Sequence, residues 1–285
     1  MGSDKKMIQK SYDKSPYGKL YLIPTPIGNL EDITFRAINT LKEVDIVYAE
    51  DTRETLNLLK HLNIQKKVES CHKYTEMMHK EKIVNILKEG KNIGYVTDRG
   101  TPLISDPGNV IVDEAIKQGI TVIALPGPNA LLPAINMSGI SNERFLFYGF
   151  LNSKQTLARK ELIDLKEIKQ TLIFYEAPHR INNSLELIKD VLGDRKIAIV
   201  REISKLYEEV IRDNISNILK ICDKIKGEIV IVVEGYKEED KQINYQEIIN
   251  NLLEKGYSKR DAIKEVSDRY NVSKNKLYNE YKEDK

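Results

Sequence analysis

Between Leu20 and Glu234, short runs rich in Val, Ile and Tyr alternate with longer segments in which apolar residues recur at helical spacing. This alternation is typical of α/β folds, in which helices cover a parallel sheet. The strand-like runs are almost continuously apolar, as expected for strands that are buried on both faces. The sequence predicts strands at 19–24, 44–50, 92–97, 120–125, 144–150, 171–176, 196–202, 208–212 and 228–234, and helices at 33–42, 53–62, 79–89, 109–118, 128–137, 156–167, 178–191 and 214–224.

The length of 285 residues indicates more than one domain, because domains usually contain about 100–200 residues. Small and polar residues at 136–145 separate two α/β blocks, and only helical patterns follow the charged stretch at 236–246. In the tail, Ser258 and Ser273 are expected to cap the second and third of three short helices. The predicted parts are a flexible N-terminal lead at 1–18, an N-terminal α/β domain at 19–138, a C-terminal α/β domain at 139–236 and a helical tail at 241–285.

The charge balance, 45 Lys and Arg against 43 Asp and Glu, neither demands nor excludes a polyanionic partner. Any nucleic-acid surface must therefore be a local patch. Cys71 and Cys222 lie far apart and have no second Cys or His at a metal-ligand spacing, which predicts a reducing cytoplasm and no structural metal. Because no apolar run approaches the ~18 residues of a membrane helix, we expect a soluble protein with no membrane partner.

Six of the nine prolines lie in three loops that directly follow strands of the first block. In open parallel sheets, ligands bind outside the carboxyl ends of the strands, and proline makes a loop there rigid. An ordinary tight turn explains any single loop equally well, but three similar loops at one sheet edge favour a ligand site. The prolines are Pro24, Pro26, Pro102, Pro107, Pro126 and Pro128.

These loops lack both G-x-x-x-x-G-K-[ST] and G-x-G-x-x-G, which disfavours a triphosphate or a dinucleotide. They offer carboxylates, hydroxyls, an amide and many backbone groups instead. Such a set suits a ligand with hydroxyls, an amino group or positive charge, and S-adenosylmethionine has all three. The side chains are those of Asp98, Thr101, Ser105, Asp106 and Asn129.

Seven segments between residues 19 and 235 match, in order, the motifs of one enzyme family. They are LYLIPTPIGNLEDITFRAINTLKEVDIVYAEDTR, VTDRGTPLISDPG, ALPGPNA, GFL, TLIFYEAPHR, REISKLYEE and KGEIVIVVEG. Together they resemble the ribosomal RNA small subunit methyltransferase I family of the tetrapyrrole methylase superfamily. The resemblance implies two α/β domains of the class III methyltransferase type with a cleft between them, a small C-terminal helical appendage, and usually a homodimer.

The same resemblance implies an S-adenosylmethionine pocket in that cleft and a partner, small-subunit (16S) rRNA or the small ribosomal subunit, but no DNA. The implied reaction is methyl transfer to the ribose 2′-hydroxyl of a cytidine in the decoding centre. Carried over position by position, the cofactor contacts would be Pro26, Asp98, Gly100, Thr101, Ile104, Ser105, Asp106, Asn129, Ala130, Tyr175, Glu176, Glu228 and Ile229.

Polar residues at strand ends are the candidates for catalysis. A ribose hydroxyl is a poor nucleophile, so we expect a base near it or a cation that stabilises the developing alkoxide. For Asp51, a helix cap is an equally good interpretation. The candidates are Glu50, Asp51, Arg53, His179, Glu202 and Lys205, and the preferred order for a base or alkoxide stabiliser is Glu50, Glu202, His179, then Lys205.

Basic residues beside these positions and in the tail are candidates for contacts with RNA phosphates. The tail resembles a small helix-turn-helix-like unit. The alternatives are solvated loop charges and a helical appendage that supports dimer or domain packing. The residues are Arg180, Arg201, Lys226, Lys259, Arg260, Lys274 and Lys276.

Arg99 departs from the family pattern, in which a small residue gives D-A-G-T-P. We expect its side chain to point outward or to pair with Asp98 or Asp106, because a single residue rarely inactivates an enzyme whose other motifs persist. The alternative is that it obstructs the pocket and repels a sulfonium. Arg99 is also the best support for a non-catalytic ribosome-binding protein. Methylation of a tetrapyrrole or another small molecule is a further alternative, against which the AEDTR and YEAPHR segments and the basic tail argue.

Overall fold

The computed structural model describes residues 8–12, 14–72, 75–238 and 244–281. Contacts divide the chain into one compact unit at residues 1–236 and a second at 237–285. The predicted lead at 1–18 lies partly outside the described residues. Within its described part, the Gln9 side-chain amide exchanges hydrogen bonds with both backbone groups of Val122, at 2.8 and 2.9 Å.

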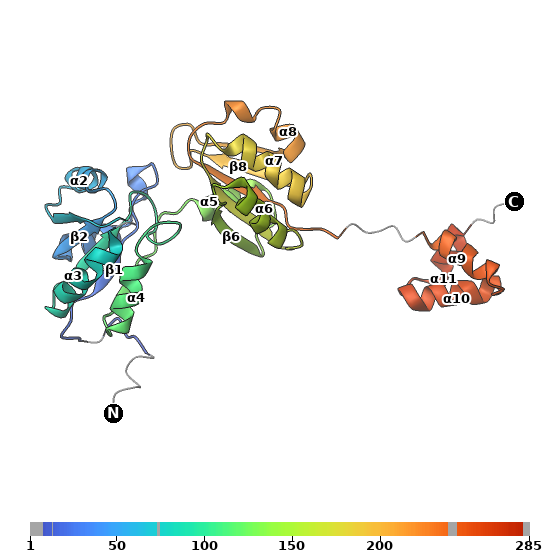
Figure 1. The fold of residues 1–285 in the computed structure, drawn as a ribbon, viewed down its shortest axis with the longest axis horizontal. Coiled ribbons are helices and arrows are strands. Elements are labelled where there is room, and N and C mark those ends of the chain that lie inside the picture. Colours follow the sequence, from blue (N-terminus) through green and yellow to red (C-terminus); the bar gives the residue numbers. More distant parts are fainter. Residues whose placement is uncertain (1–7, 13, 73–74, 239–243, 282–285) are drawn as a thin grey trace. The chain divides into compact units, whose positions relative to one another are not determined.

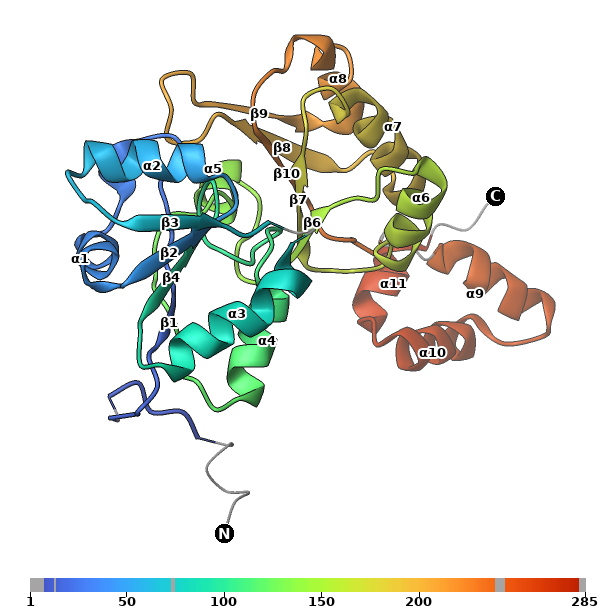
Figure 2. The ribbon, with the colours of Figure 1, turned by 60° about the vertical axis from the view of Figure 1, so that its left-hand side comes forward.

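The first lobe of the large unit, β1–β5 with α1–α4, contains a sheet of five parallel strands among the described residues, in the order β3-β2-β4-β1-β5 (Figure 1). Helices α1 and α2 pack on one face, and α3 and α4 pack on the other (Figure 2). The bounds are β1 Leu20–Leu22, η2 Leu30–Asp32, α1 Phe35–Glu43, β2 Ile46–Ala49, α2 Thr52–His61, β3 Lys67–Ser70, α3 Glu76–Lys88, β4 Ile93–Val96, α4 Asn109–Lys117 and β5 Val122–Ala124.

The order of the first sheet creates a crevice between β1 and β4. From β1 the chain crosses to β2 on one side, whereas from β4 it crosses over β1 to β5 on the other side. The chain therefore leaves these two neighbouring strands in opposite directions at the carboxyl edge of the sheet, which is where open α/β sheets bind ligands.

The second lobe, α5 with β6–β10 and α6–α8, contains a mixed sheet whose described strands run in the order β6-β7-β10-β8-β9. Only β6 and β7 pair in parallel; the other pairs are antiparallel, so the prediction of parallel units is wrong for this block. A short loop joins β8 to β9, and such a loop can connect only antiparallel neighbours. The bounds are α5 Leu131–Ser138, β6 Phe145–Phe150, α6 Gln155–Asp164, β7 Thr171–Glu176, α7 Ile181–Leu192, β8 Lys196–Arg201, β9 Glu209–Asn214, α8 Ile215–Ile218, η3 Cys222–Lys224 and β10 Ile229–Val233.

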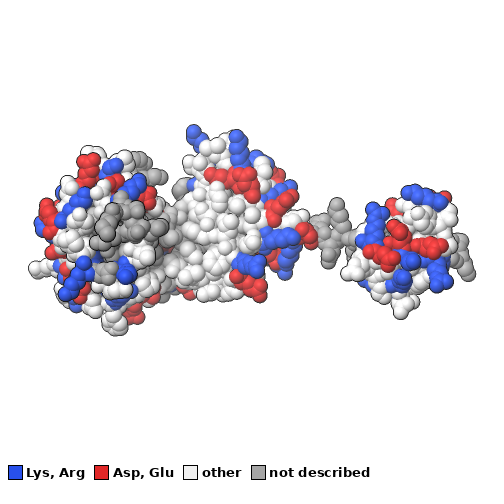
Figure 3. Space-filling view, turned by 90° about the horizontal axis from the view of Figure 1, so that it is seen from below, with Lys and Arg blue, Asp and Glu red and all other residues white. Residues whose placement is uncertain are grey.

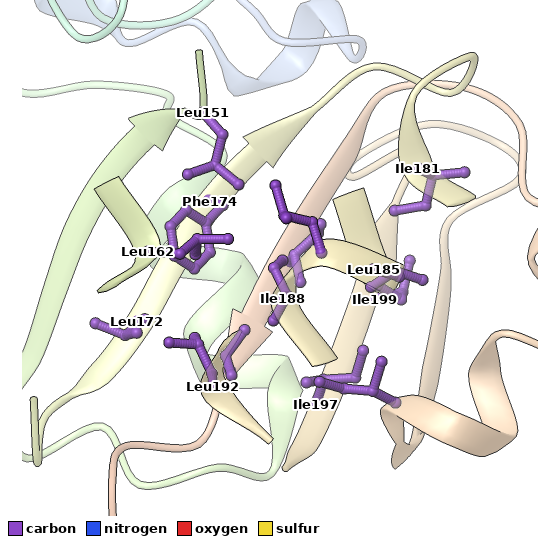
Figure 4. Close-up of a cluster of buried hydrophobic side chains, with 14 of the residues drawn as sticks. Leu151, Leu162, Leu172, Phe174, Ile181, Leu185, Ile188, Leu192, Ile197 and Ile199 are labelled. Carbon is purple, nitrogen blue, oxygen red and sulfur yellow. The ribbon is translucent and has the colours of Figure 1, made fainter. Parts of the chain in front are cut away.

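The second sheet is buried on both faces. Leu162 of α6 and Ile188 of α7 pack with Phe174 of β7 on one face (Figure 4). On the other face, Ala134 and Ile135 of α5 pack against the sheet. Helix α5 therefore belongs to the second core although it precedes residue 139, and the domain junction at 139 stays a prediction.

One strand of the structure was not predicted, and one predicted helix is divided. The edge strand β3 was not expected, because its sequence, KVES, is mostly polar. It pairs with β2 alone, and Tyr48 of β2 donates a hydrogen bond of 3.0 Å to Glu69. The single helix expected at 214–224 is instead divided into α8 and η3.

The second unit consists, in its described part, of three helices around a small apolar core. The Ser258 side chain accepts a hydrogen bond of 3.2 Å from the Asp261 N–H, which confirms the predicted cap. Ser273 occupies the corresponding position before the last helix without a side-chain bond. Part of the predicted tail, 241–243 and 282–285, lies outside the described residues. The bounds are α9 Tyr245–Glu254, α10 Lys259–Tyr270 and α11 Lys274–Glu280.

A search of the described residues finds no helix with the length and apolar character that a bilayer span requires.

Candidate active site

The three proline-containing loops are joined to one another at the carboxyl edge of the first sheet. Thr25, after β1, and Gly100, after β4, exchange backbone hydrogen bonds of 2.9 and 3.0 Å. Gly100 has a φ of +79°, and an added Cβ would lie 3.2 Å from Ile27. The Thr101 hydroxyl donates a bond of 2.9 Å to the Pro128 carbonyl in the loop after β5. The edge is therefore a connected frame.

A cavity of about 360 Å³ lies between this frame and the second sheet. We call it the central cavity. Its walls come from the loops after β4 and β5, from the end of β7 and from the start of β10. All the predicted cofactor residues except Pro26 and Asp98 line it, namely Gly100, Thr101, Ile104, Ser105, Asp106, Asn129, Ala130, Tyr175, Glu176, Glu228 and Ile229.

Pro26 and Asp98 line a neighbouring hollow of about 550 Å³ instead, which we call the α2 hollow. Arg99 lines both spaces. The structure therefore brings the predicted cofactor residues together in two adjoining spaces that share one side chain.

Several residues of the central cavity were missed by the sequence reasoning. Phe150 ends β6 and makes an edge-on contact with Tyr175, with ring centroids 5.6 Å apart. Its position at a strand end, in the GFL segment, was a usable signal. The others also lie within the quoted family segments but were not singled out there, and they are Ile27, Ala177, Pro178, Ile203 and Val230.

Carboxyl groups gather beside the central cavity. Burial raises the pKa of Asp106 to about 6, and the nearby charges of Glu50 and Asp98 act in the same direction. Burial is also the main cause that raises the pKa of Glu50, with Asp98 contributing. A nearby cation stabilises the ionised form of such carboxyl groups. This end of the cavity therefore favours a positively charged ligand.

Arg99 pairs with Glu228 across the two lobes, and both side chains are about half exposed. The pairing was expected, but its partner is neither Asp98 nor Asp106. Asp98 instead accepts a hydrogen bond of 2.8 Å from the Asp51 N–H. The Lys205 ammonium lies 3.1 Å from the same Glu228 carboxylate, so one acid serves two cations.

Two of the acidic catalytic candidates have structural partners. Asp51 accepts a bond of 2.8 Å from the Arg53 N–H and caps α2, as its alternative interpretation expected. Hydrogen bonds from Arg53 lower the pKa of Asp51 to about 2. Glu202 accepts a bond of 2.9 Å from the Glu228 N–H, and this bond is the main cause that lowers the pKa of Glu202. Both carboxylates are therefore weak bases.

The remaining catalytic candidates differ in exposure. The Arg53 side chain is 84% exposed and lines neither the central cavity nor the α2 hollow. His179 is exposed in the turn before α7 and also lines neither of these two spaces. Lys205 lines the α2 hollow, and its ammonium lies 3.0 Å from Glu202.

Two predicted RNA contacts are held by other groups of the chain. Arg180 donates to the carbonyls of Leu151 and Asn152, each at 3.1 Å. Arg201 donates to Glu209 at 2.5 Å and to the Lys226 carbonyl at 3.2 Å. These guanidinium groups support loops of the second lobe.

Glu176 has a similarly structural position. Its side chain is only 1% exposed, it accepts a bond of 2.8 Å from the Ala177 N–H, and it also bonds Ser184. A ligand in the central cavity would therefore meet the backbone of this segment rather than a free carboxylate.

The other predicted RNA contacts are basic side chains at the surface. Lys226 is exposed before β10, and Arg260, Lys274 and Lys276 are exposed in the second unit. The Lys259 ammonium lies 4.9 Å from the centre of the Tyr281 ring.

No group of three or more His, Cys, Asp or Glu side chains within the described ranges is arranged to hold a metal ion.

Comparisons with known proteins agree on one family. The Tetrapyrrole (Corrin/Porphyrin) Methylases family matches residues 19–219. The chain is 45% identical to the Ribosomal RNA small subunit methyltransferase I of Bacillus subtilis (strain 168), over 94% of this chain and 95% of the relative. It is 39% identical to the protein of the same name from Vibrio cholerae serotype O1 (strain ATCC 39315 / El Tor Inaba N16961), over 91% and 92% of the two chains.

Two solved structures show the same fold at low sequence identity. Diphthine synthase superposes with a TM-score of 0.60 at 15% identity, covering 76% of this chain and 90% of that one. A uroporphyrin-III-C-methyltransferase from Thermus thermophilus superposes with a TM-score of 0.56 at 15% identity, covering 76% and 94%. At this identity the likeness supports the fold alone.

Proposed function

The chain belongs to the ribosomal RNA small subunit methyltransferase I family within the tetrapyrrole methylases, and we propose that it methylates the ribose 2′-hydroxyl of a cytidine in the decoding centre of small-subunit rRNA. The relatives' names supply methyl transfer to small-subunit rRNA. The cytidine and its 2′-hydroxyl come from the family resemblance. The observation that carries the proposal is the central cavity, which gathers the expected cofactor residues from both lobes.

The chemistry of the central cavity fits S-adenosylmethionine. Asp106 offers a carboxyl group in a setting that favours a nearby cation. Thr101, Ser105 and Asn129 offer neutral polar groups, and Phe150 and Ile229 offer apolar surface. When bound, S-adenosylmethionine supplies an electrophilic methyl group on a sulfonium.

We assign the residues of this chain mainly to positioning and charge control. In-line transfer depends on holding the acceptor oxygen behind the methyl group, and the hydrogen-bonded frame of loops keeps the cavity wall fixed. Lys205 is our candidate for stabilising charge on the acceptor oxygen, because its ammonium lies where the two spaces meet. Glu50, whose pKa is raised, is a better base than Glu202, whose pKa is lowered.

We also propose a homodimer that works in the cytoplasm. Strand β6 is a sheet edge on which Phe145 is 39% exposed. Seen from below, the part of the second lobe that contains β6 has few charged side chains (Figure 3). An uncharged edge of this kind is a suitable contact for a second copy. Both cysteines are buried and free, in agreement with a reducing setting.

The test combines calorimetric titration of S-adenosylmethionine with methyl transfer to isolated small ribosomal subunits. Ala177→Phe fills the central cavity, and Ile163→Phe, at a 54% exposed position on α6, is the matched control. We expect binding and transfer by the wild type and the control, and at least about tenfold weaker binding by Ala177→Phe. A 2′-O-methyl group also protects the adjacent RNA linkage from alkaline cleavage, which identifies the methylated position.

Two results would contradict the proposal. The first is methyl transfer to a porphyrinoid but not to rRNA. The second is a wild type that does not bind S-adenosylmethionine while Arg99→Ala does, because this chain would then have lost its cofactor through Arg99.

A further inference from the structure

Apart from Pro26, Asp98 and the shared Arg99, the lining of the α2 hollow consists of residues that are not among the expected cofactor contacts. One wall is a single face of α2, because Glu54, Asn57, Leu58 and His61 follow helical spacing. The facing wall is the loop after β1, and Arg99 and Lys205 lie at the boundary with the second lobe. The volume of about 550 Å³ lies within the range of ligand sites, which is about 300–1,000 Å³.

We infer, from the lining that α2 supplies, that the α2 hollow is the acceptor site. It receives the target ribonucleotide, with a flanking phosphate beside Arg99 and Lys205. The inference rests on the proposed function and adds the location of its RNA substrate. The hollow and the central cavity share Arg99, and Lys205 in the hollow bonds Glu228 of the cavity at 3.1 Å. An acceptor in the hollow is therefore next to the proposed methyl donor.

Charge distinguishes the α2 hollow from another hollow that adjoins the central cavity. That second hollow shares Ile27, Asn129 and Ile203 with the cavity, and its charged lining residues are Asp32 and Glu208. All its lining residues are described, and no Lys or Arg is among them. A ribonucleotide within a chain has a phosphate on each side, so two acids without a cation disfavour it.

The charged side chains of the α2 hollow are arranged to admit a phosphate. Its acids are Glu54, which is exposed, and Asp98, which accepts a hydrogen bond from the Asp51 N–H. Arg99 holds Glu228 in a half-exposed pair, and such pairs are weak. Arg99 can therefore exchange this carboxylate for a phosphate, which a guanidinium binds through two parallel hydrogen bonds.

The rest of the lining matches a nucleoside. Pro26, Leu30 and Leu58 offer apolar surface on which a base can lie, and Asn57 and His61 offer hydrogen-bonding groups for its edge. Enzymes that modify one nucleotide commonly take it out of its stack into such a pocket.

Gly28 places the second cation. A Cβ at this position would lie 2.4 Å from Lys205 Cγ, so any larger residue at position 28 would displace the lysine stem from its present path.

The test fills the hollow from α2. In Asn57→Trp a large ring replaces an exposed amide of the lining. The matched control is Leu56→Trp, at a neighbouring position that is 49% exposed and lines neither the α2 hollow nor the central cavity. Circular dichroism checks that both variants fold. We expect S-adenosylmethionine binding within about twofold of wild type in both variants, and a loss of at least about tenfold in methyl transfer to small subunits in Asn57→Trp alone.

A second variant tests the phosphate contact. Arg99→Gln is expected to raise the KM for small subunits. The slope of log KM against log salt concentration should decrease by about one unit. Its S-adenosylmethionine affinity is measured in parallel, because Arg99 also lines the central cavity.

The outcomes separate the two proposals. Normal transfer by Asn57→Trp, or loss of S-adenosylmethionine binding in that variant, would overturn the acceptor site while the enzyme activity stands. A wild type without transfer to rRNA would overturn both.

Discussion

Asn in place of Asp106 should remove most of the pH dependence of S-adenosylmethionine binding. With a pKa of about 6, about one eleventh of the Asp106 carboxyls are ionised at pH ~5 and about ten elevenths at pH ~7. If the cationic ligand favours the ionised form, wild-type affinity rises about tenfold over this range. In Asp106→Asn, affinity should stay near the low-pH value of the wild type throughout.

The same substitution has a predicted effect on stability, and its sign follows from the raised pKa. The native state binds the Asp106 proton more tightly than the unfolded state does. Protonation of Asp106 therefore contributes fully to the free energy of unfolding below pH ~4, and this contribution is lost as pH rises through about 6. A shift of about two units corresponds to at most about 3 kcal/mol, and partial exposure reduces this to about 1 kcal/mol. Asp106→Asn should therefore be about 1 kcal/mol more stable than wild type at pH ~7 and no more stable at pH ~4.

Binding is measured by calorimetric titration of S-adenosylmethionine at several pH values between about 5 and 7. Stability is measured by urea unfolding of the free protein at pH ~4 and pH ~7. Asp113→Asn, which removes an exposed carboxylate from α4, is the control for net charge. The groups that act on Asp106 are Glu50, Asp98 and Thr97. If Asp106→Asn keeps the tenfold rise in affinity, a carboxyl group other than Asp106 is responsible, and the reasoning about Asp106 is refuted.

Three further predictions concern stability, each measured on the full chain. Phe174→Ala should lower the free energy of unfolding in urea by about 3–5 kcal/mol, because its side chain is 1% exposed in the core of the second lobe, and a loss below about 1 kcal/mol would contradict this packing. Gly227→Ala should cost at least about 1 kcal/mol more than Gly119→Ala. Both glycines have a positive φ, of +90° and +72°, but of the two only residue 227 would bring a Cβ against a carboxylate, at 2.4 Å, so equal losses would refute the contact. Ser258→Ala should destabilise α10 by about 1 kcal/mol, measured as faster amide hydrogen exchange in that helix. Ser273→Ala removes no capping bond and should have little effect. Equal effects of the two substitutions would contradict the assigned caps.

The sequence predicted the part of the site that depends on strand order and loop chemistry. Continuous apolar runs followed by proline and glycine located the frame of loops, and the structure joins two of those loops through Thr25 and Gly100. Periodicity does not encode strand direction, so the antiparallel pairs of the second sheet were not predicted. Strand β3 was missed for a similar reason, since an edge strand needs few apolar residues.

The partners of charged side chains were the least predictable feature. Glu176 was expected to contact the cofactor because of the family resemblance, and Arg180 was expected to contact RNA because it follows a strand end. Their actual partners include Ser184 and the Leu151 carbonyl, which no local pattern connects to them. A charge at a strand end therefore indicates a polar cleft, but whether the charge faces a ligand depends on the tertiary structure.

The pairing of Arg99 with Glu228 joins the two lobes, but it is not what holds them together. Exposed ion pairs contribute about 0–1 kcal/mol, and salt weakens them further. The stronger connection is apolar: Ile27, from a loop of the first lobe, packs in the same cluster as Ala134 and Ile135 of α5 and the second sheet. Arg99 can therefore change partners without separating the lobes, as the proposed acceptor site requires.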